Sequence, residues 1–208
     1  MVQIVTRELS GELKCDDTIV LTYTITYPEI TSLNSFGTTI FNMYNKQKAI
    51  DLEKYTKTDL YPEACKLYKY NKENGYPIMI YEVNSQFTIT YNQDDFVSLY
   101  IDQYEFTGGA HGNTIRSSQT WNLKTGQILD LSYFYPNNPF FVLDILRNIN
   151  AQIKMQIEQG GAYFDNYTEL LLENFNPESY YLTPYGIAIY FQQYDIAPYS
   201  SGIPVFYL

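Results

Sequence analysis

The chain has 208 residues, of which 45% are hydrophobic and only 17% are charged, so it can bury a core and is not a disordered protein. A formal net charge of −10 argues against nucleic-acid binding, because phosphates would be repelled, and favours encounter with a basic protein. No apolar run is long enough to span a bilayer, and the first residues lack a signal-peptide pattern; we expect either a cytosolic protein or one whose export signal lies outside this sequence.

The first third of the chain changes from a strand pattern to a helix pattern. Residues 18–27 alternate between apolar side chains and threonines, which predicts a half-buried strand that Pro28 ends. From residue 33 to residue 72 apolar side chains recur at helical spacing, and Ser32 or Asn34 is placed to cap the first turn. We therefore expect one strand followed by a long helical region.

The middle of the chain has the pattern of an antiparallel meander. Two segments, Asn92–Asp95 and Lys124–Gln127, have the composition of hairpin turns. Apolar alternation on either side of these turns predicts a series of strands. These strands are expected at residues 77–84, 87–91, 96–106, 115–123 and 128–131.

The last third combines helices with short strands. Asn138 is predicted to cap a helix whose first residue is Pro139 and whose apolar stripe runs from Phe141 to Ile153. A short helix at 168–174 and strands at 180–183, 187–191 and 204–208 complete the chain. This order predicts an α+β fold of antiparallel sheets with helices packed on one face, in two intimately packed halves, residues 1–106 and 107–208.

The only histidine, His111, lies in a glycine-rich segment between two predicted strands. Three glycines in five positions, among them Gly109, indicate a tight crossing with positive φ or close backbone approach. As a general base, His111 would need a carboxylate or a carbonyl to orient it and a substrate cavity beside it, and Asp102, Glu105 or Asp195 could serve as the carboxylate. The alternative, which we favour, is that the imidazole makes a structural hydrogen bond that holds the loop.

A second distinctive segment is Tyr194–Gly202, which contains Pro198 and therefore cannot be a central strand. Tyr199, next to that proline, would be held rigidly in a loop, a geometry that suits insertion into a partner. The alternative is that the proline and the tyrosine only cover the edge of a sheet. Both interpretations stay open at this point.

The sequence offers few features of a catalytic or metal site. Cys15 and Cys65 do not form a CxxC motif, and two cysteines with one histidine cannot supply a common zinc site without carboxylates. A disulfide between them is compatible with the sequence, but we expect two buried thiols. Calcium-loop, P-loop, nucleophile-elbow and dinucleotide-binding motifs are absent. We therefore expect no metal, no cofactor and no catalytic residue.

Three segments together resemble a known family. They are Tyr104–Gly112, Leu123–Gln127 and Gly186–Gly202. They are similar to a bacterial domain of unassigned activity that occurs in the extracytoplasmic part of lysozyme-sensing anti-sigma-V factors and in the N-terminal region of some peptidoglycan deacetylases. The N-terminal half resembles the companion domain that usually precedes it.

The resemblance implies a non-enzymatic module of the cell envelope that binds a lysozyme-like protein or peptidoglycan glycan. In the deacetylases catalysis belongs to a separate metal-binding domain, which this chain lacks. The alternatives are a cell-wall glycan hydrolase that uses His111 and nearby carboxylates, or a cytosolic orphan of the fold. The residues expected to bind are Gly109, His111, Asp195, Ala197, Pro198 and Tyr199.

Overall fold

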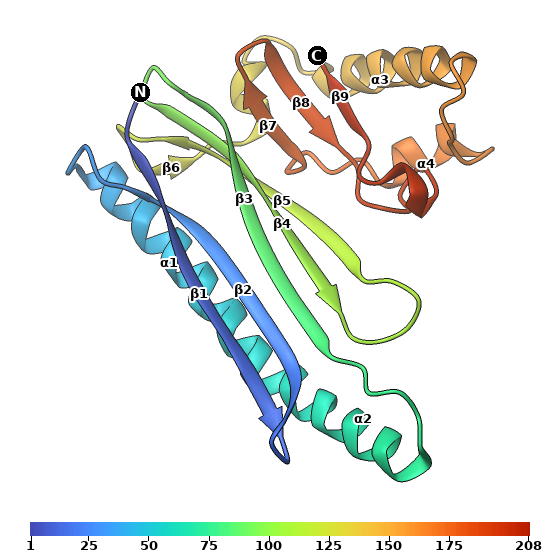
Figure 1. Cartoon of the computed structure of the whole chain (residues 1–208). Coiled ribbons are helices and arrows are strands. Elements are labelled where there is room, and N and C mark those ends of the chain that lie inside the picture. Colours follow the sequence, from blue (N-terminus) through green and yellow to red (C-terminus); the bar gives the residue numbers. More distant parts are fainter. The chain divides into compact units, whose positions relative to one another are not determined.

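The computed structural model describes residues 1–208 and contains two β-sheets and several helices, which confirms the α+β class (Figure 1). The first sheet has the strand order β1 (Ile4–Cys15), β2 (Thr18–Ile30), β3 (Tyr81–Gln93), β4 (Phe96–Phe106), β5 (Asn113–Asn122) and β6 (Gln127–Ile128). The second sheet has the order β7 (Tyr180–Thr183), β8 (Gly186–Tyr190) and β9 (Val205–Tyr207).

The residues form two compact units, and strands β3, β4 and β5 contribute to both. The first unit comprises Met1–Thr88, Ile101–Ile115 and Leu123–Gly126, and the second comprises Ile89–Tyr100, Arg116–Asn122 and Gln127–Leu208. The proposed division at residues 106 and 107 stays a prediction.

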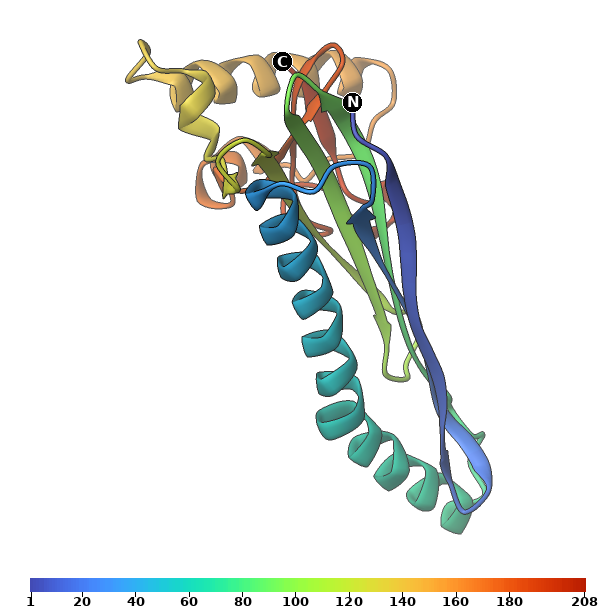
Figure 2. The same ribbon diagram turned by 90° about the vertical axis from the view of Figure 1, so that its left-hand side faces the viewer.

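A long helical segment in the first unit connects β2 to β3. It consists of α1 (Phe36–Tyr55), the short π-helix η1 (Thr56–Leu60) and α2 (Tyr61–Asn74). Together they form one curved helix beside β1 and β2 (Figure 2). Strands β2 and β3 pair in parallel, so the six-stranded sheet is mixed, with this helical segment as the crossover.

Two local predictions in the first unit are wrong. The cap of α1 is Ser35, not Ser32 or Asn34, because Ser35 and Thr38 exchange side-chain-to-backbone hydrogen bonds in a capping box. Pro28 does not end β2, which continues to Ile30; its pairing with β3 ends at Ile25, so the missing N–H of Pro28 costs no hydrogen bond on that side.

Strand β1 was not expected, and residues 81–93 form one strand where two were expected. Gly11 in the middle of β1 lies against Tyr23 of the neighbouring strand: an added Cβ would be 2.7 Å from the Tyr23 hydroxyl, so the Tyr23 side chain would have to move. The expected turn at Asn92–Asp95 is confirmed, with positive φ at Asp94 and Asp95.

The second unit carries η2 (Leu131–Phe134), α3 (Phe141–Glu158), α4 (Tyr167–Glu173) and η3 (Tyr199–Ser201). Helix α3 begins at Phe141, so Pro139 lies outside it, and the side-chain oxygen of Asn138 accepts from the Phe140 N–H. The predicted apolar stripe is confirmed, because the inner face of α3 is buried against β8 and β9.

Each unit has its own apolar core. The core of the first unit forms where α1 and α2 pack on β2 and β3, and the core of the second forms between α3, α4 and the three-stranded sheet. None of the helices is both long and apolar enough to cross a membrane.

Candidate functional site

The glycine-rich loop between β4 and β5 is shaped by backbone conformation and by one close contact. Gly108 and Gly109 have φ values of 94° and 100°, a region that favours glycine. At Gly112 the constraint is space: an added Cβ would lie 2.4 Å from Cε2 of Tyr104 and 2.6 Å from the carbonyl oxygen of Glu105. The loop therefore folds back onto the Tyr104 ring.

His111 is exposed on this loop and bonds to the backbone next to it. Its Nδ1 lies 3.0 Å from the carbonyl oxygen of Gly112, so Nδ1 carries the proton and donates it. The histidine thus makes the local structural hydrogen bond that was favoured from the sequence. An exposed imidazole that bonds to the backbone removes the main support for the hydrolase alternative, which a deep cleft with an acid beside His111 would have favoured.

A polar cleft lies on the sheet of the first unit and includes Tyr104, the residue against which the loop packs. Its volume is about 280 Å³ and it is open to solvent. The side chains come from neighbouring strands β3, β4 and β5, and all of them carry hydrogen-bonding groups. The lining residues are Asn84, Gln86, Asp102, Tyr104 and Thr114.

Strand alternation brings these side chains to one face. In β3 the buried residues Tyr81, Val83 and Ser85 face the core, so Asn84 and Gln86 point to the opposite side of the sheet. Asp102 and Tyr104 are likewise two residues apart on β4. The sequence gives the necessary signal, polar residues at every second position of adjacent strands, but strand neighbours had to be known to recognise the cleft.

The segment Tyr194–Gly202 lies in the second unit, and its centre is structural. Ile196 and Ala197 are 0% and 1% exposed and belong to the apolar core of that unit. The carbonyl oxygen of Ile196 accepts from the N–H of Phe164, which fixes the segment further. Ala197, expected to bind a partner, is therefore a core residue.

Asp195 has a positioning role in the same segment. Its carboxylate accepts from the backbone N–H of Gln192 at 2.7 Å, and the Gln192 amide in turn bonds to the backbone N–H and carbonyl of Arg116. Partial burial raises the pKa of Asp195, and the hydrogen bond from Gln192 opposes the rise. Asp195 thus stabilises the turn that contains Gln192, and the Gln192 side chain bonds to the backbone of β5.

Pro198 and Tyr199 are only partly buried, in agreement with the loop that was expected around them. The Tyr199 ring packs against Tyr194, with ring centroids 5.7 Å apart, and Tyr194 has a φ of 68°. These contacts belong to the second unit, whereas Gly109 and His111 belong to the first.

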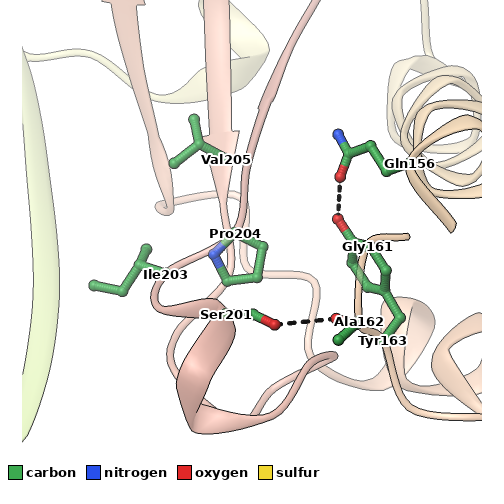
Figure 3. Close-up of a pocket in the computed structure, with 8 residues that line it drawn as sticks. All are labelled: Gln156, Gly161, Ala162, Tyr163, Ser201, Ile203, Pro204 and Val205. Carbon is green, nitrogen blue, oxygen red and sulfur yellow. Dashed lines mark hydrogen bonds between the residues drawn. The ribbon is translucent and has the colours of Figure 1, made fainter. Parts of the chain in front are cut away.

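A second cavity of about 280 Å³ lies beside this segment (Figure 3). The end of α3 and the segment after it, Gly161–Tyr163, form one side, and Ser201–Val205 form the other. The Ser201 hydroxyl donates to the Ala162 carbonyl and Tyr163 donates to Gln156, so polar groups at the rim are already engaged. The other lining residues are glycine, alanine, isoleucine, proline and valine, so few side chains remain that could recognise a polar ligand.

Among the 208 residues, no group of three or more histidine, cysteine, aspartate or glutamate side chains is close enough together to hold a metal ion.

Two family models match separate parts of the chain. Residues 14–114 match the family described as deacetylase PdaC, and residues 137–208 match a protein family of unknown function, DUF3298. The family resemblance seen in the sequence motifs is thereby confirmed. All five cleft residues lie within the first match, whose last residue is Thr114. The segment Tyr194–Gly202 lies within the second.

Two solved structures share the fold along nearly the whole chain. A DUF3298 family member from Bacteroides fragilis is 17% identical with a TM-score of 0.73, and the alignment covers 100% of this chain and 90% of that one. A DUF3298 family protein from Pseudomonas aeruginosa is 15% identical with a TM-score of 0.60, covering 99% and 90%. No curated protein matches the sequence significantly.

Proposed function

We propose that this chain, in which a PdaC-like segment is joined to a DUF3298 domain, is a non-enzymatic binding module of the cell envelope that recognises peptidoglycan glycan. The observation that carries the proposal is the polar cleft of the first unit. Every one of its five lining side chains can hydrogen-bond, and one of them is a tyrosine.

The chemistry of the cleft suits a sugar. Two carboxamides, a carboxylate and a hydroxyl provide both donors and acceptors for hydroxyl and N-acetyl groups, and the Tyr104 ring adds an apolar surface with a polar tip. The cleft is open, so a ligand that belongs to a longer polymer can enter it without threading through the protein. The loop that packs on Tyr104 through Gly112 fixes that side of the cleft.

The same lining supports binding without hydrolysis. Glycoside hydrolysis generally uses two carboxyl groups on opposite sides of the scissile bond. Asp102 is the one carboxylate that lines this cleft, and His111 bonds to its own loop. We therefore propose that glycan binds and is released unchanged.

Isothermal titration calorimetry with soluble peptidoglycan fragments tests the proposal. Gln86→Ala removes an exposed amide from the cleft and should weaken binding about 5- to 10-fold, the effect of one lost hydrogen bond. Thr88→Ala, an exposed position on the same face of β3 outside the lining, is the matched control and should bind like the wild type.

Three results would each overturn a part of this proposal. Absence of heat with every glycan fragment would refute glycan binding, and equal weakening by both substitutions would place the site elsewhere. Release of new reducing ends during a long incubation would refute the non-enzymatic part.

A basic lysozyme-like protein is a second candidate ligand, and the net charge of −10 is the observation that favours it. Titration with lysozyme at low and high salt tests this candidate separately. Binding that falls steeply with salt and is unaffected by Gln86→Ala would support a protein ligand on another surface.

A further inference from the structure

Two cysteines that are 50 positions apart in the sequence meet in the first unit. Cys15 is the last residue of β1 and is buried, and Cys65 lies in α2 and is partly exposed. Both belong to the apolar core formed by α2 and the β1–β2 hairpin. Their thiols are within hydrogen-bonding reach of each other, which together with burial raises the pKa of Cys15.

Polar contacts on both sides of the pair hold helix and hairpin together. One helical turn before Cys65, the Tyr61 hydroxyl donates to the carbonyl of Lys14 at 2.6 Å. Nearly one turn after it, the Tyr68 hydroxyl lies 3.2 Å from the hydroxyl of Thr18, which is the ladder partner of Cys15.

An ion pair extends this set of contacts. Lys72 Nζ lies 3.8 Å from the carboxylate of Asp16, the residue after Cys15. The three contacts reach residues 14, 16 and 18 of the hairpin from residues 61, 72 and 68 of α2. The fold therefore keeps the two thiols adjacent without any covalent bond.

We propose that Cys15 and Cys65 form a disulfide that links the β1–β2 hairpin to α2 when the protein is in an oxidising compartment. The proposal is independent of glycan binding, because it rests on residues outside the cleft. The thiols are held in place by the folded chain, so closing the bond requires little rearrangement.

The chemistry is a two-step thiol–disulfide exchange with a disulfide oxidant, such as oxidised glutathione or a dithiol-disulfide oxidoreductase. The partly exposed Cys65 loses its proton to solvent and attacks one sulfur of the oxidant, whose other sulfur leaves as a thiolate. Cys15 then loses its proton and attacks the Cys65 sulfur, expelling the second thiolate. The protein gives up two electrons and two protons, and the oxidant becomes two thiols.

The experiment equilibrates the folded wild-type protein with oxidised glutathione, and in parallel with a reductant, before free thiols are blocked with a maleimide. Mass spectrometry should show two blocked thiols after reduction, and none after oxidation, with a mass loss of about 2 Da. Peptide mapping without reduction should join the peptides that contain Cys15 and Cys65. The oxidised protein should melt roughly 5–10 °C higher than the reduced protein, because the bond restricts the unfolded chain.

Cys15→Ser and Cys65→Ser serve as controls, since neither can form the bond and neither should change its melting temperature with the redox state. Tyr61→Phe keeps both thiols and removes one contact beside them, so it should lower the equilibrium constant for disulfide formation about 3- to 10-fold. Two blockable thiols after oxidation, a stable glutathione adduct on Cys65, or disulfide-linked dimers of the wild type would overturn the proposal.

Discussion

The two segments that are most distinctive in the sequence have different structural roles. The loop around His111 places that side chain in solvent, and its glycines serve backbone shape and the contact with Tyr104. In Tyr194–Gly202 the middle residues, Ile196 and Ala197, are core, and Asp195 holds a turn. A distinctive motif can therefore mark either a surface beside a cleft or a tightly packed interior, and burial is what separates the two.

The sharpest test of this contrast places the same charge in both segments. Ala197→Glu puts a carboxylate among core side chains and should lower the free energy of unfolding by more than about 3 kcal/mol. Ala110→Glu, at an exposed position beside His111, should change it by no more than about 0.5 kcal/mol. Urea unfolding followed by circular dichroism measures both. Similar losses in the two variants would show that the contrast between the segments is false.

A smaller effect is expected from adding one methyl group to a glycine of each segment. Gly112→Ala forces a Cβ against Tyr104 and the Glu105 carbonyl and should cost about 2–3 kcal/mol. Because Tyr104 lines the cleft, the same change should also weaken binding of glycan.

Gly202→Ala is the counterpart in the second unit. It has open space around its Cβ but a φ of 68°, so backbone strain alone should cost about 1–2 kcal/mol, with glycan binding unchanged. Thermal unfolding measures the stability of both variants, and calorimetric titration of the folded proteins with glycan fragments measures their binding. If Gly112→Ala kept full affinity for glycan, the packing of the loop on Tyr104 would not contribute to the binding site.

Much of the fold could be predicted because local patterns were strong. The alternation in residues 18–27, the apolar stripe of α3 and the Asp94–Asp95 turn each arise from interactions within a few residues. The resemblance of three short motifs to a known family was also sufficient to identify the fold. The wrong predictions concerned the ends of elements, which depend on neighbouring strands. An example is the continuation of β2 through Pro28, where β2 pairs with β1.

Long-range features could not be read from the sequence in the same way. The parallel pairing of β2 and β3 depends on where the helical crossover returns the chain, and alternation is the same for either direction of pairing. The polar cleft required the order of β3, β4 and β5. The adjacency of Cys15 and Cys65 required knowing that α2 packs against the hairpin, which no spacing of cysteines reveals.

The smallest predicted effect concerns the pH dependence of stability through Asp195. Burial raises the pKa of its carboxyl in the folded protein above the unfolded value, so the folded state binds more protons just above that value. The free energy of unfolding therefore falls as pH rises through the folded pKa, because the ionised form is less well solvated. Asp195→Asn removes this penalty and keeps an oxygen that can accept from Gln192.

Melting temperatures of Asp195→Asn and the wild type should accordingly be nearly equal at pH 3 and should diverge toward pH 7. The gain at neutral pH should be only about 0.5 kcal/mol in favour of the variant, since solvent screens a carboxylate that is partly exposed. Asp195→Ala removes the acceptor as well and should be less stable than the wild type at both pH values. If Asp195→Asn instead becomes less stable than the wild type as the pH rises, the hydrogen bond from Gln192 to the ionised carboxylate outweighs the cost of burial. The segment then depends on the charge of Asp195 as well as on the hydrogen-bond acceptor it supplies.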